Sequence, residues 1–252
     1  MVIVGPSDGR GVDIDVKDII YIVGENDKFY YYDESDNDWI REPGGGWGKR
    51  ISYQLNSQNS ASPRLYMRGG NDDIYYKTRG SSSGWIKLIN YNTRALSTIE
   101  STSSSPISSL THVDSNYNPY YSGSPMTIDY VGGAGFGKVM QAEEMAGSFS
   151  QGLYAAGWIF QPFPPVDYGD RIFKFNSSEG MWELIDGIAK DIAMGGPQDD
   201  VWMIGDNNKI YKRVNNDWVP TETGTGKRIA VADDGTPYII GENNKIYKFV
   251  EQ

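Results

Sequence analysis

A short sheet motif recurs along the chain, and its recurrence limits the folds that these 252 residues can adopt. The motif is a glycine, an acidic residue, Asn, a second Asn or Asp, and Lys, followed by a strand with alternating apolar residues. Its three clear copies begin at Gly24, Gly205 and Gly241. Copies of roughly 35 to 50 residues with period-two strands are typical of repeat architectures such as propellers.

Weaker copies fill the rest of the chain, so the sequence predicts an all-β fold. Each copy supplies four short strands separated by Gly, Asn, Asp or Ser, which is the content of one propeller blade. We therefore expect one domain, residues 1–252, folded as a six-bladed β-propeller of four-stranded antiparallel blades. The expected blades are residues 5–41, 42–88, 89–140, 141–185, 186–221 and 222–252, the last completed by residues 1–4. The third copy is degenerate, and residues 109–113 are its expected innermost strand.

The start of the chain is expected to close the ring. The last copy lacks an outer strand, while the apolar segment Met1–Val4 precedes the first copy without a place in it. We therefore expect Met1–Val4 to pair with residues 246–250. This pairing would cover a strand edge that an open sheet leaves exposed.

Charge and composition exclude several kinds of partner. A formal net charge of −10 and a pI near 4.6 disfavour binding to nucleic acid and to anionic lipid. Apolar runs are only a few residues long, so no membrane insertion is expected. Because the chain holds no cysteine and starts without a signal-peptide pattern, we expect a cytoplasmic protein, with release or non-classical secretion left open.

The polar tetrad in each copy is the first candidate binding site. In a propeller these turns share one face with the Gly-rich connections between blades, so their carboxylates, amides and ammonium groups would form a ring that suits sugar hydroxyls. The alternative is that they serve only as hairpin turns, because Asn and Asp tolerate a positive φ. The tetrad residues are Glu25, Asn26, Asp27, Lys28, Asp206, Asn207, Asn208, Lys209, Glu242, Asn243, Asn244 and Lys245.

Aromatic residues supply the second set of candidates. Trp202 and Tyr238 stand at equivalent places on the second strand of their copies. Each ring could stack on a sugar or pack between blades. Other tryptophans recur at the start of outer strands, where packing between blades is the favoured interpretation. These are Trp39, Trp85, Trp182 and Trp218.

An aromatic insertion in the fourth copy departs most from the repeat. Residues 158–168 are expected to form a loop between the second and third strands, with Trp158, Phe160 and Tyr168 as candidate contact residues. Aromatic segments of this kind are costly to expose unless they contact something. Three interpretations stay open: a lid over the channel, a platform for ligand stacking, and a protein or dimer contact. Trp47, in the Gly-rich connection after the first copy, could contribute to each.

No residue pattern indicates catalysis, a metal ion or a cofactor. His112 is the only histidine, and no cysteine accompanies it. Glu143 and Glu144 are adjacent, so on a strand they point to opposite faces and do not make an acid and base pair. The sequence therefore predicts a binding protein and not an enzyme.

Parts of the chain resemble the tectonin family of β-propeller lectins. Residues 228–240 (Arg-Ile-Ala-Val-Ala-Asp-Asp-Gly-Thr-Pro-Tyr-Ile-Ile) and residues 190–218 are similar to that family's inner strand, Asp-Gly turn, and Ile-Tyr strand ending near a Trp. The resemblance is poor in the third copy. It implies a lectin that binds glycans or glycoconjugates, including microbial and methylated sugars, at shallow sites repeated around the ring. The alternative function is a protein-interaction scaffold that uses residues 158–168, with homo-oligomerisation left open.

Overall fold

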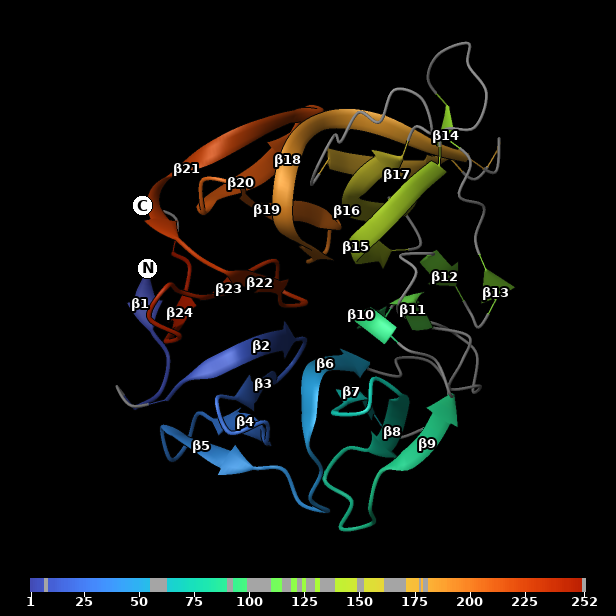
Figure 1. Cartoon of the computed structure of the whole chain (residues 1–252). Helices are drawn as coiled ribbons and strands as arrows, with labels where there is room; N and C mark the ends of the chain where they lie inside the picture. The colour runs from blue at the N-terminus through green and yellow to red at the C-terminus, as the bar shows by residue number, and fades with distance from the viewer. Residues whose placement is uncertain are drawn as a thin grey trace.

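Short antiparallel strands surround a central axis (Figure 1). The computed structural model describes residues 1–250 except 7–8, 55–62, 90–92, 99–109, 115–118, 122–123, 126–129, 132–138, 149–151, 161–170, 177 and 179–180. Every element in these residues is a strand. The described chain accordingly holds no helix with the length and apolar character needed to cross a bilayer.

The described strands form four separate sheets of four strands and one sheet of eight, numbered I to V here. Sheet I holds β2 (Gly11–Val16), β3 (Ile20–Gly24), β4 (Phe29–Asp33) and β5 (Asp38–Arg41). Sheet II holds β6 (Gly48–Gln54), β7 (Arg64–Gly69), β8 (Ile74–Thr78) and β9 (Ile86–Ile89). Sheet III holds β10 (Thr93–Thr98), β11 (Leu110–Asp114), β12 (Pro119–Tyr121) and β13 (Ser124–Pro125).

The remaining strands belong to sheets IV and V. Sheet IV holds β14 (Tyr130–Val131), β15 (Val139–Ser148), β16 (Gly152–Phe160), β17 (Arg171–Asn176), β18 (Met181–Gly195), β19 (Asp200–Gly205), β20 (Lys209–Val214) and β21 (Asp217–Thr225). Sheet V holds β22 (Arg228–Val231), β23 (Pro237–Ile240), β24 (Ile246–Lys248) and β1 (Val2–Ile3).

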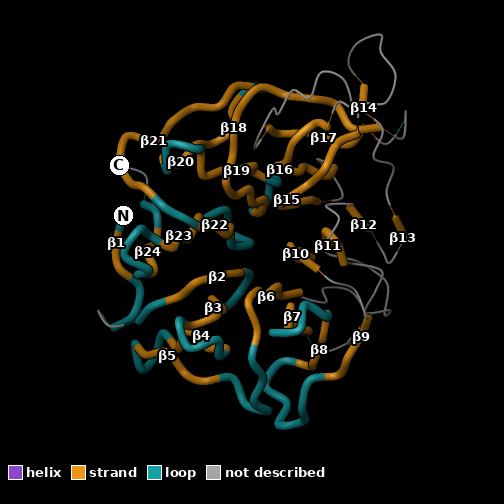
Figure 2. The backbone as a smooth tube through the Cα atoms, viewed as in Figure 1, coloured by secondary structure: helices purple, strands orange, loops and turns teal. Residues whose placement is uncertain are grey.

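The sheets close into a ring, as Figure 2 shows. Neighbouring innermost strands contact one another in the order β2, β6, β10, β15, β18 and β22, and β22 contacts β2 again. From these strands the antiparallel ladders run outward. The chain is therefore an all-β protein with a β-propeller fold.

Sheet IV differs from the predicted series of separate four-stranded blades. β18 is one strand of 15 residues. It pairs with β17 as far as Ile188 and with β19 from Ala189 onward. Gly187 has a φ of 120°, a conformation open to glycine, so the strand passes from one ladder to the next without a loop. The described residues thus form four separate four-stranded sheets and one double-sized sheet, not six separate blades.

The predicted closure of the ring is confirmed. β1 pairs antiparallel with β24, with Val2 opposite Lys248 and Ile3 opposite Tyr247. The N–H of Val4 also donates to the carbonyl of Ile246 at 3.0 Å. The two ends of the chain therefore share one sheet, which covers the edge that β24 would otherwise expose.

The innermost strand of sheet III was placed incorrectly from the sequence. Residues 109–113 were expected there, but β10 lies innermost and β11, which carries His112, is second. β10 reads Thr-Arg-Ala-Leu-Ser-Thr. Its polar residues hide the alternation that marks the other innermost strands.

The hydrophobic core lies between neighbouring sheets. Tyr21 and Val23 of sheet I form one buried cluster with Ile51 and Leu65 of sheet II. Sheets IV and V share a second cluster, and sheets V and I share a third. Because strand residues alternate between two faces, sheets I and V each bury side chains against both of their neighbours. Any surface hollow at a junction is therefore shaped by residues from two sheets.

Candidate functional site

The predicted tetrads form tight turns whose first Asn is engaged within the protein. Its Oδ1 atom accepts the backbone N–H two residues further on, at 3.0 to 3.2 Å. Its Nδ2 atom donates to a tyrosine hydroxyl on the following strand, at 2.8 to 2.9 Å. The pairs are Asn26 with Tyr30, Asn207 with Tyr211, and Asn243 with Tyr247.

A fourth copy of this turn was missed in the sequence. Asn71 donates to the hydroxyl of Tyr75 at 3.0 Å in sheet II. The tetrad pattern is hidden there because Gly70 replaces the acidic residue and Asp73 replaces the lysine. The Asn-to-Tyr spacing of four residues is the signal that could have found it.

The residue after this Asn joins neighbouring sheets. It has a φ of 62° to 65°, which Asp and Asn tolerate better than most residues. Its carbonyl accepts an N–H from the start of the next innermost strand at 2.8 to 3.0 Å. The geometry therefore favours the turn interpretation of the tetrads. The bonds run from Gly48 to Asp27, Thr93 to Asp72, Gly226 to Asn208, and Gly11 to Asn244.

Some predicted residues do come together on this face of the disc, the turn face. Glu25 accepts a hydrogen bond from Nδ2 of Asn244 at 2.7 Å. It lines a hollow of about 440 Å³ with Asn26 and Trp39. Trp47 is 63% exposed, and the Nζ atom of Lys28 lies 5.4 Å from its ring centroid.

The outer-strand tryptophans pack within the propeller, as the sequence interpretation favours. The Nε1 atom of Trp85 donates to the carbonyl of Gly45 at 2.7 Å, and that of Trp218 donates to the carbonyl of Asp186. Gly46 approaches the Trp85 ring so closely that a Cβ there would lie 2.3 Å from its Nε1 atom. Trp182 is fully buried. Trp85 therefore holds the connection between β5 and β6, and Trp218 packs against β18.

The aromatic residues of the second strands form a recurring pair with lysine that sequence analysis missed. Each ring stands directly opposite a lysine on the third strand. The lysine Nζ atom lies 5.2 to 5.9 Å from the ring centroid, within the range of a cation–π contact. The repeated Ile-Tyr-Lys sequence carries the signal for two of them. The pairs are Tyr154 with Lys174, Trp202 with Lys212, and Tyr238 with Lys248.

Three hollows lie beside two of these pairs, Trp202 with Lys212 and Tyr238 with Lys248. The first, of about 600 Å³, lies between sheets IV and V and is lined by Trp202, Lys212 and Lys248. A second, of about 350 Å³, shares Trp202 and Lys212 with it. A third, of about 640 Å³, extends to sheet I and shares Asp234 and Lys248 with the first. Because they share walls, we treat the three as one trough.

The walls of the trough contain both apolar and charged groups. Lys212 forms an ion pair with Asp200 at 2.8 Å. The backbone N–H of Thr236 donates to Asp234 at 2.8 Å and lowers the pKa of that carboxyl, so Asp234 is anionic. Burial raises the pKa of Tyr238, which keeps its phenol neutral.

Trp202 forms the base of the trough. It is 2% exposed and packs edge-on against Phe249 with centroids 5.6 Å apart. Its buried Nε1 atom finds no hydrogen-bond acceptor among the described residues. A buried donor without an acceptor is costly.

The predicted loop at residues 158–168 is partly wrong. Trp158, Ile159 and Phe160 extend β16, where Trp158 stands opposite Gln141 and Phe160 opposite Val139. The alternation of the segment is masked in the sequence by its run of aromatics. Residues 161–168, including Tyr168, lie outside the described residues.

The described residues hold no group of three His, Cys, Asp or Glu side chains that could bind a metal ion. His112 is fully buried on β11.

Comparisons with known proteins identify the fold and not a family. No family model and no curated protein matches the chain. Among solved structures, the WD40 β-propeller domain of Doa1 matches with a TM-score of 0.54 and 14% identity, covering 100% of this chain and 96% of that one. YCF48 bound to a D1 peptide matches with a TM-score of 0.52 and 15% identity, covering 100% and 81%.

A third similar structure is much longer than this chain. It is the extracellular domain of a putative one-component system from B. thetaiotaomicron, with a TM-score of 0.55 and 11% identity. The match covers 95% of this chain and 32% of that one. At these identities the likeness concerns the β-propeller fold alone.

Proposed function

We propose that this chain is a non-catalytic protein-interaction scaffold that binds an extended peptide segment of its partner in the trough. The observation that carries the proposal is the continuity of the three hollows, which share Trp202, Lys212, Asp234 and Lys248 as common walls. A trough of this kind accommodates a chain of several residues, whereas a single sugar ring would fill only one hollow.

The chemistry of the walls suits a peptide. Trp202 and Phe249 offer apolar contact, of the kind that concentrates binding energy at interfaces. Lys212 and Lys248 supply donors, and Asp200 and Asp234 accept. YCF48, whose structure contains a bound D1 peptide, illustrates that a chain of this fold can bind a peptide. A cytoplasmic location belongs to the same proposal, because cysteine-free chains do not depend on an oxidising compartment.

A displayed random-peptide library, selected on the full chain, tests this proposal. Selected peptides should bind the variant Lys212→Gln/Lys248→Gln at least about tenfold more weakly than the wild type, since two charge-assisted hydrogen bonds are lost. The matched control is Lys209→Gln/Lys245→Gln, which removes two charges from the turn face of the same two sheets. Failure to select any peptide, or equal weakening in both variants, would contradict the scaffold.

A second candidate function is multivalent glycan binding, favoured by one observation. The aromatic ring with an opposing lysine recurs at three positions, Tyr154, Trp202 and Tyr238. A ring face with a nearby donor suits sugars, and several weak sites on one disc gain avidity on a surface that presents many copies. A glycan array that includes methylated sugars separates the two functions. A lectin should bind glycans in multiples per chain, whereas the scaffold should bind peptides once and leave the array blank.

We also propose that the ring counts six sectors, with the two halves of sheet IV as two of them. The proposal is supported by the contacts among β2, β6, β10, β15, β18 and β22 around the axis. The two ladders of β18, one up to Ile188 and one from Ala189, support it as well. An experimental structure that lacks the change of ladder between these residues would contradict it.

A further inference from the structure

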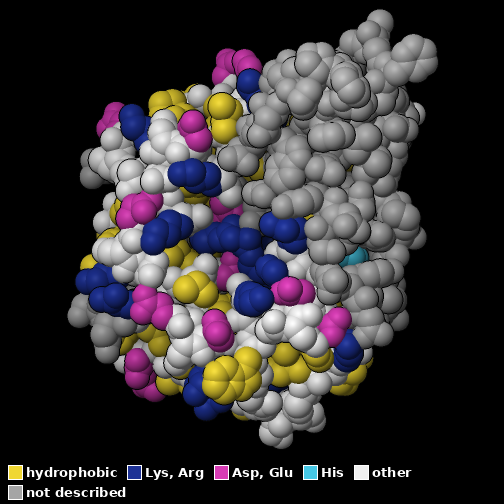
Figure 3. Space-filling model, in the orientation of Figure 1, with side chains coloured by type: hydrophobic (Ala, Val, Ile, Leu, Met, Phe, Trp, Pro, Cys, Tyr) yellow, Lys and Arg dark blue, Asp and Glu magenta, His cyan; other side chains and the backbone are white. Residues whose placement is uncertain are grey.

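The mouth of the axial channel on the turn face is basic, although the chain as a whole is acidic. Figure 3 shows Lys and Arg side chains gathered at the centre of this face. The basic residues of this region lie where the innermost strands begin to pair with their second strands. Five of the ladders skip one residue where the innermost strand begins to pair outward. The skipped residue is basic in three of them, Lys49, Arg94 and Lys190, and is Val12 or Glu143 in the other two. Such bulges re-aim side chains, here at the rim of the channel.

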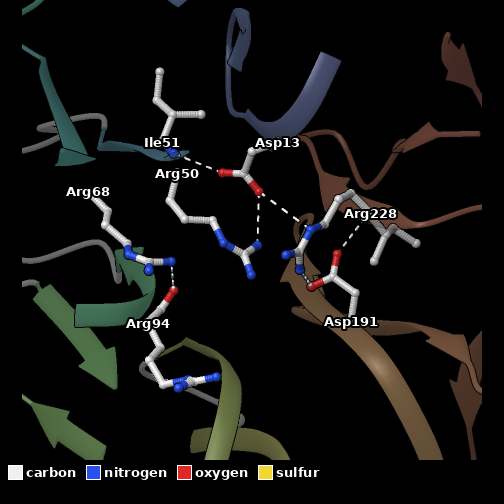
Figure 4. A network of polar contacts seen from close by, with 8 residues as sticks. Asp13, Arg50, Ile51, Arg68, Arg94, Asp191 and Arg228 are labelled. Carbon is white, nitrogen blue, oxygen red and sulfur yellow. Dashed lines mark hydrogen bonds and ion pairs between the residues drawn. The ribbon is translucent and has the colours of Figure 1, made fainter. Parts of the chain in front are cut away.

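Two aspartates organise the arginines of the mouth (Figure 4). Asp13 lies 3.0 Å from Nη1 of Arg50 and 3.7 Å from Nε of Arg228. Asp191 lies 3.3 Å from Nη1 of Arg228. Each carboxylate also accepts a backbone N–H from the neighbouring innermost strand, at 2.8 Å from Ile51 and at 2.7 Å from Ile229. The guanidinium groups are thus held at the mouth by a rigid frame.

The basic residues at the mouth carry more positive charge than the carboxylates of Asp13 and Asp191 can neutralise. Lys190 and Lys227 donate to Asn208 and Asn244, at 2.6 and 3.0 Å. These acceptors are neutral amides, so the contacts leave the two ammonium charges uncompensated. At the skipped residue of each described innermost ladder and the residue after it, and at the matching positions before β22, basic residues also outnumber acidic ones, although Lys49 forms an ion pair with Asp72 at 3.1 Å. The basic residues are Lys49, Arg50, Arg94, Lys190, Lys227 and Arg228, and the acidic ones are Asp13, Glu143, Glu144 and Asp191.

The close spacing of the guanidinium groups also indicates a site for an anion. Arg68 reaches the carbonyl of Arg94 at 2.8 Å. Burial lowers the pKa of Arg68, and the nearby charges of Arg50 and Arg94 lower it further, while Asp72 raises it. Like charges held this close repel one another, and an anion placed among them relieves the repulsion.

We propose that the mouth of the channel binds an oxyanion of the phosphate class, either as free polyphosphate or as a phosphorylated side chain. Arginine forks and lysine ammonium groups on several strands can each donate to a different phosphate oxygen. The channel below offers only about 70 Å³ of space between walls such as Ile14, Ser52 and Ile192. The anion therefore sits at the rim and does not pass along the axis.

Titration calorimetry with sodium tripolyphosphate tests this site on the full chain. We expect binding to the wild type that weakens as salt is raised. The variant Lys190→Gln/Lys227→Gln should bind about tenfold more weakly. The control Lys209→Gln/Lys245→Gln removes two charges from the same face, further from the axis, and should bind like the wild type. Should the first variant fail to fold, Arg94→Gln replaces it with the same expectation.

A second arm identifies the source of the phosphate. A phosphoserine peptide is compared with its serine counterpart and with tripolyphosphate. Tighter binding of either phosphate compound supports the site and names its source. The site is refuted if neither binds, or if both lysine pairs weaken binding equally, since the anion would then sense only the overall charge. The trough variant Lys212→Gln/Lys248→Gln should leave phosphate binding intact, which keeps this test separate from that of the scaffold.

Discussion

The junction between sheets I and II and the junction between sheets IV and V are built from the same repeat, but one is sealed and the other is open. In the first, the ring of Tyr53 packs at a tilt against the ring of Tyr21, with centroids 5.0 Å apart. Register places Val231 of β22 where β6 has Tyr53. At the second junction the residue in this place is smaller, and the trough lies beside Trp202.

Polar groups complete the seal between sheets I and II. The hydroxyl of Tyr53 donates to Asp18 at 2.7 Å, and Arg79 contacts Asp18 at 3.1 Å. Lys77 and Glu42 form an ion pair at 3.0 Å with 1% exposure on each side. By register Phe249 takes the place of Lys77 in sheet V. The comparison teaches that side-chain size and polarity at a few inward positions decide whether a junction is structural or available to a ligand.

Breaking the buried ion pair should produce the largest effect. Lys77→Ala leaves Glu42 charged and buried without its partner, so the free energy of unfolding should fall by about 3 to 5 kcal/mol. Denaturant unfolding measures it. The double variant Lys77→Met/Glu42→Gln removes both charges and should recover most of the loss. A single variant as stable as the wild type would show that the pair does not seal this junction.

Filling the junction between sheets IV and V should produce the next largest effect. Val231→Tyr should seal the trough as Tyr53 seals its counterpart, and should weaken binding of a selected peptide at least about tenfold. The larger side chain should destabilise the fold by about 1 to 3 kcal/mol. Val231→Ala is the control, because it is also destabilising but leaves the trough open. Loss of peptide binding in both variants would mean that stability and not filling explains the result.

The turns should behave alike at the two junctions. Asn26→Ala at the junction of sheets I and II and Asn207→Ala at the junction of sheets IV and V each remove a hydrogen bond to a tyrosine and one to the backbone. Each should lower the free energy of unfolding by about 1 kcal/mol, measured by denaturant unfolding. Glu242→Ala should stay within about 0.5 kcal/mol of the wild type. If the Asn variants leave the free energy of unfolding unchanged, the tetrads become candidates for ligand binding again.

A pH titration probes the smallest difference between the junctions. Asp15 accepts the hydroxyl of Ser52 at 2.8 Å and the N–H of Tyr53 at 2.7 Å, whereas register places Ala193 at the equivalent position of sheet IV. Enclosure by the protein raises the pKa of Asp15. A raised pKa means that the folded state holds the proton more tightly than the unfolded state. Stability from this group is therefore present below the ordinary carboxyl pKa of about 3.9 and is lost as pH rises through the folded value.

The variant Asp15→Asn isolates this titration. The free energy of unfolding of the wild type, relative to the variant, should decrease as the pH rises above the ordinary carboxyl pKa of about 3.9. Unfolding in denaturant at several pH values measures the trend. A relative stability that rises with pH would show that hydrogen bonds outweigh enclosure at Asp15.

The parts of this fold that the sequence predicts well follow from local sequence patterns. The repeated turn, the alternating strands around it and the pairing of Val2 and Ile3 with β24 were all accessible from residue order. Asn and Gly at turns, and the alternation of apolar and polar residues in strands, depend on backbone conformation within a few residues. Each copy of the repeat can therefore be recognised in the sequence. The prediction failed where this local signal is weak, as in the polar strand β10, or where a strand runs on through Gly187.

The candidate sites depended on residues that meet only in the folded chain. Asp13 and Arg50 are 37 residues apart, as are Asp191 and Arg228, and a net charge of −10 gave no hint of a basic mouth. The trough likewise joins residues far apart in the chain, such as Trp202 of sheet IV and Lys248 of sheet V. The sequence by itself determined the repeat and its closure, because these follow from local propensity and pairing. Only the tertiary structure decided which side chains face one another across a junction or around the axis, and charge and shape at a site follow from that proximity.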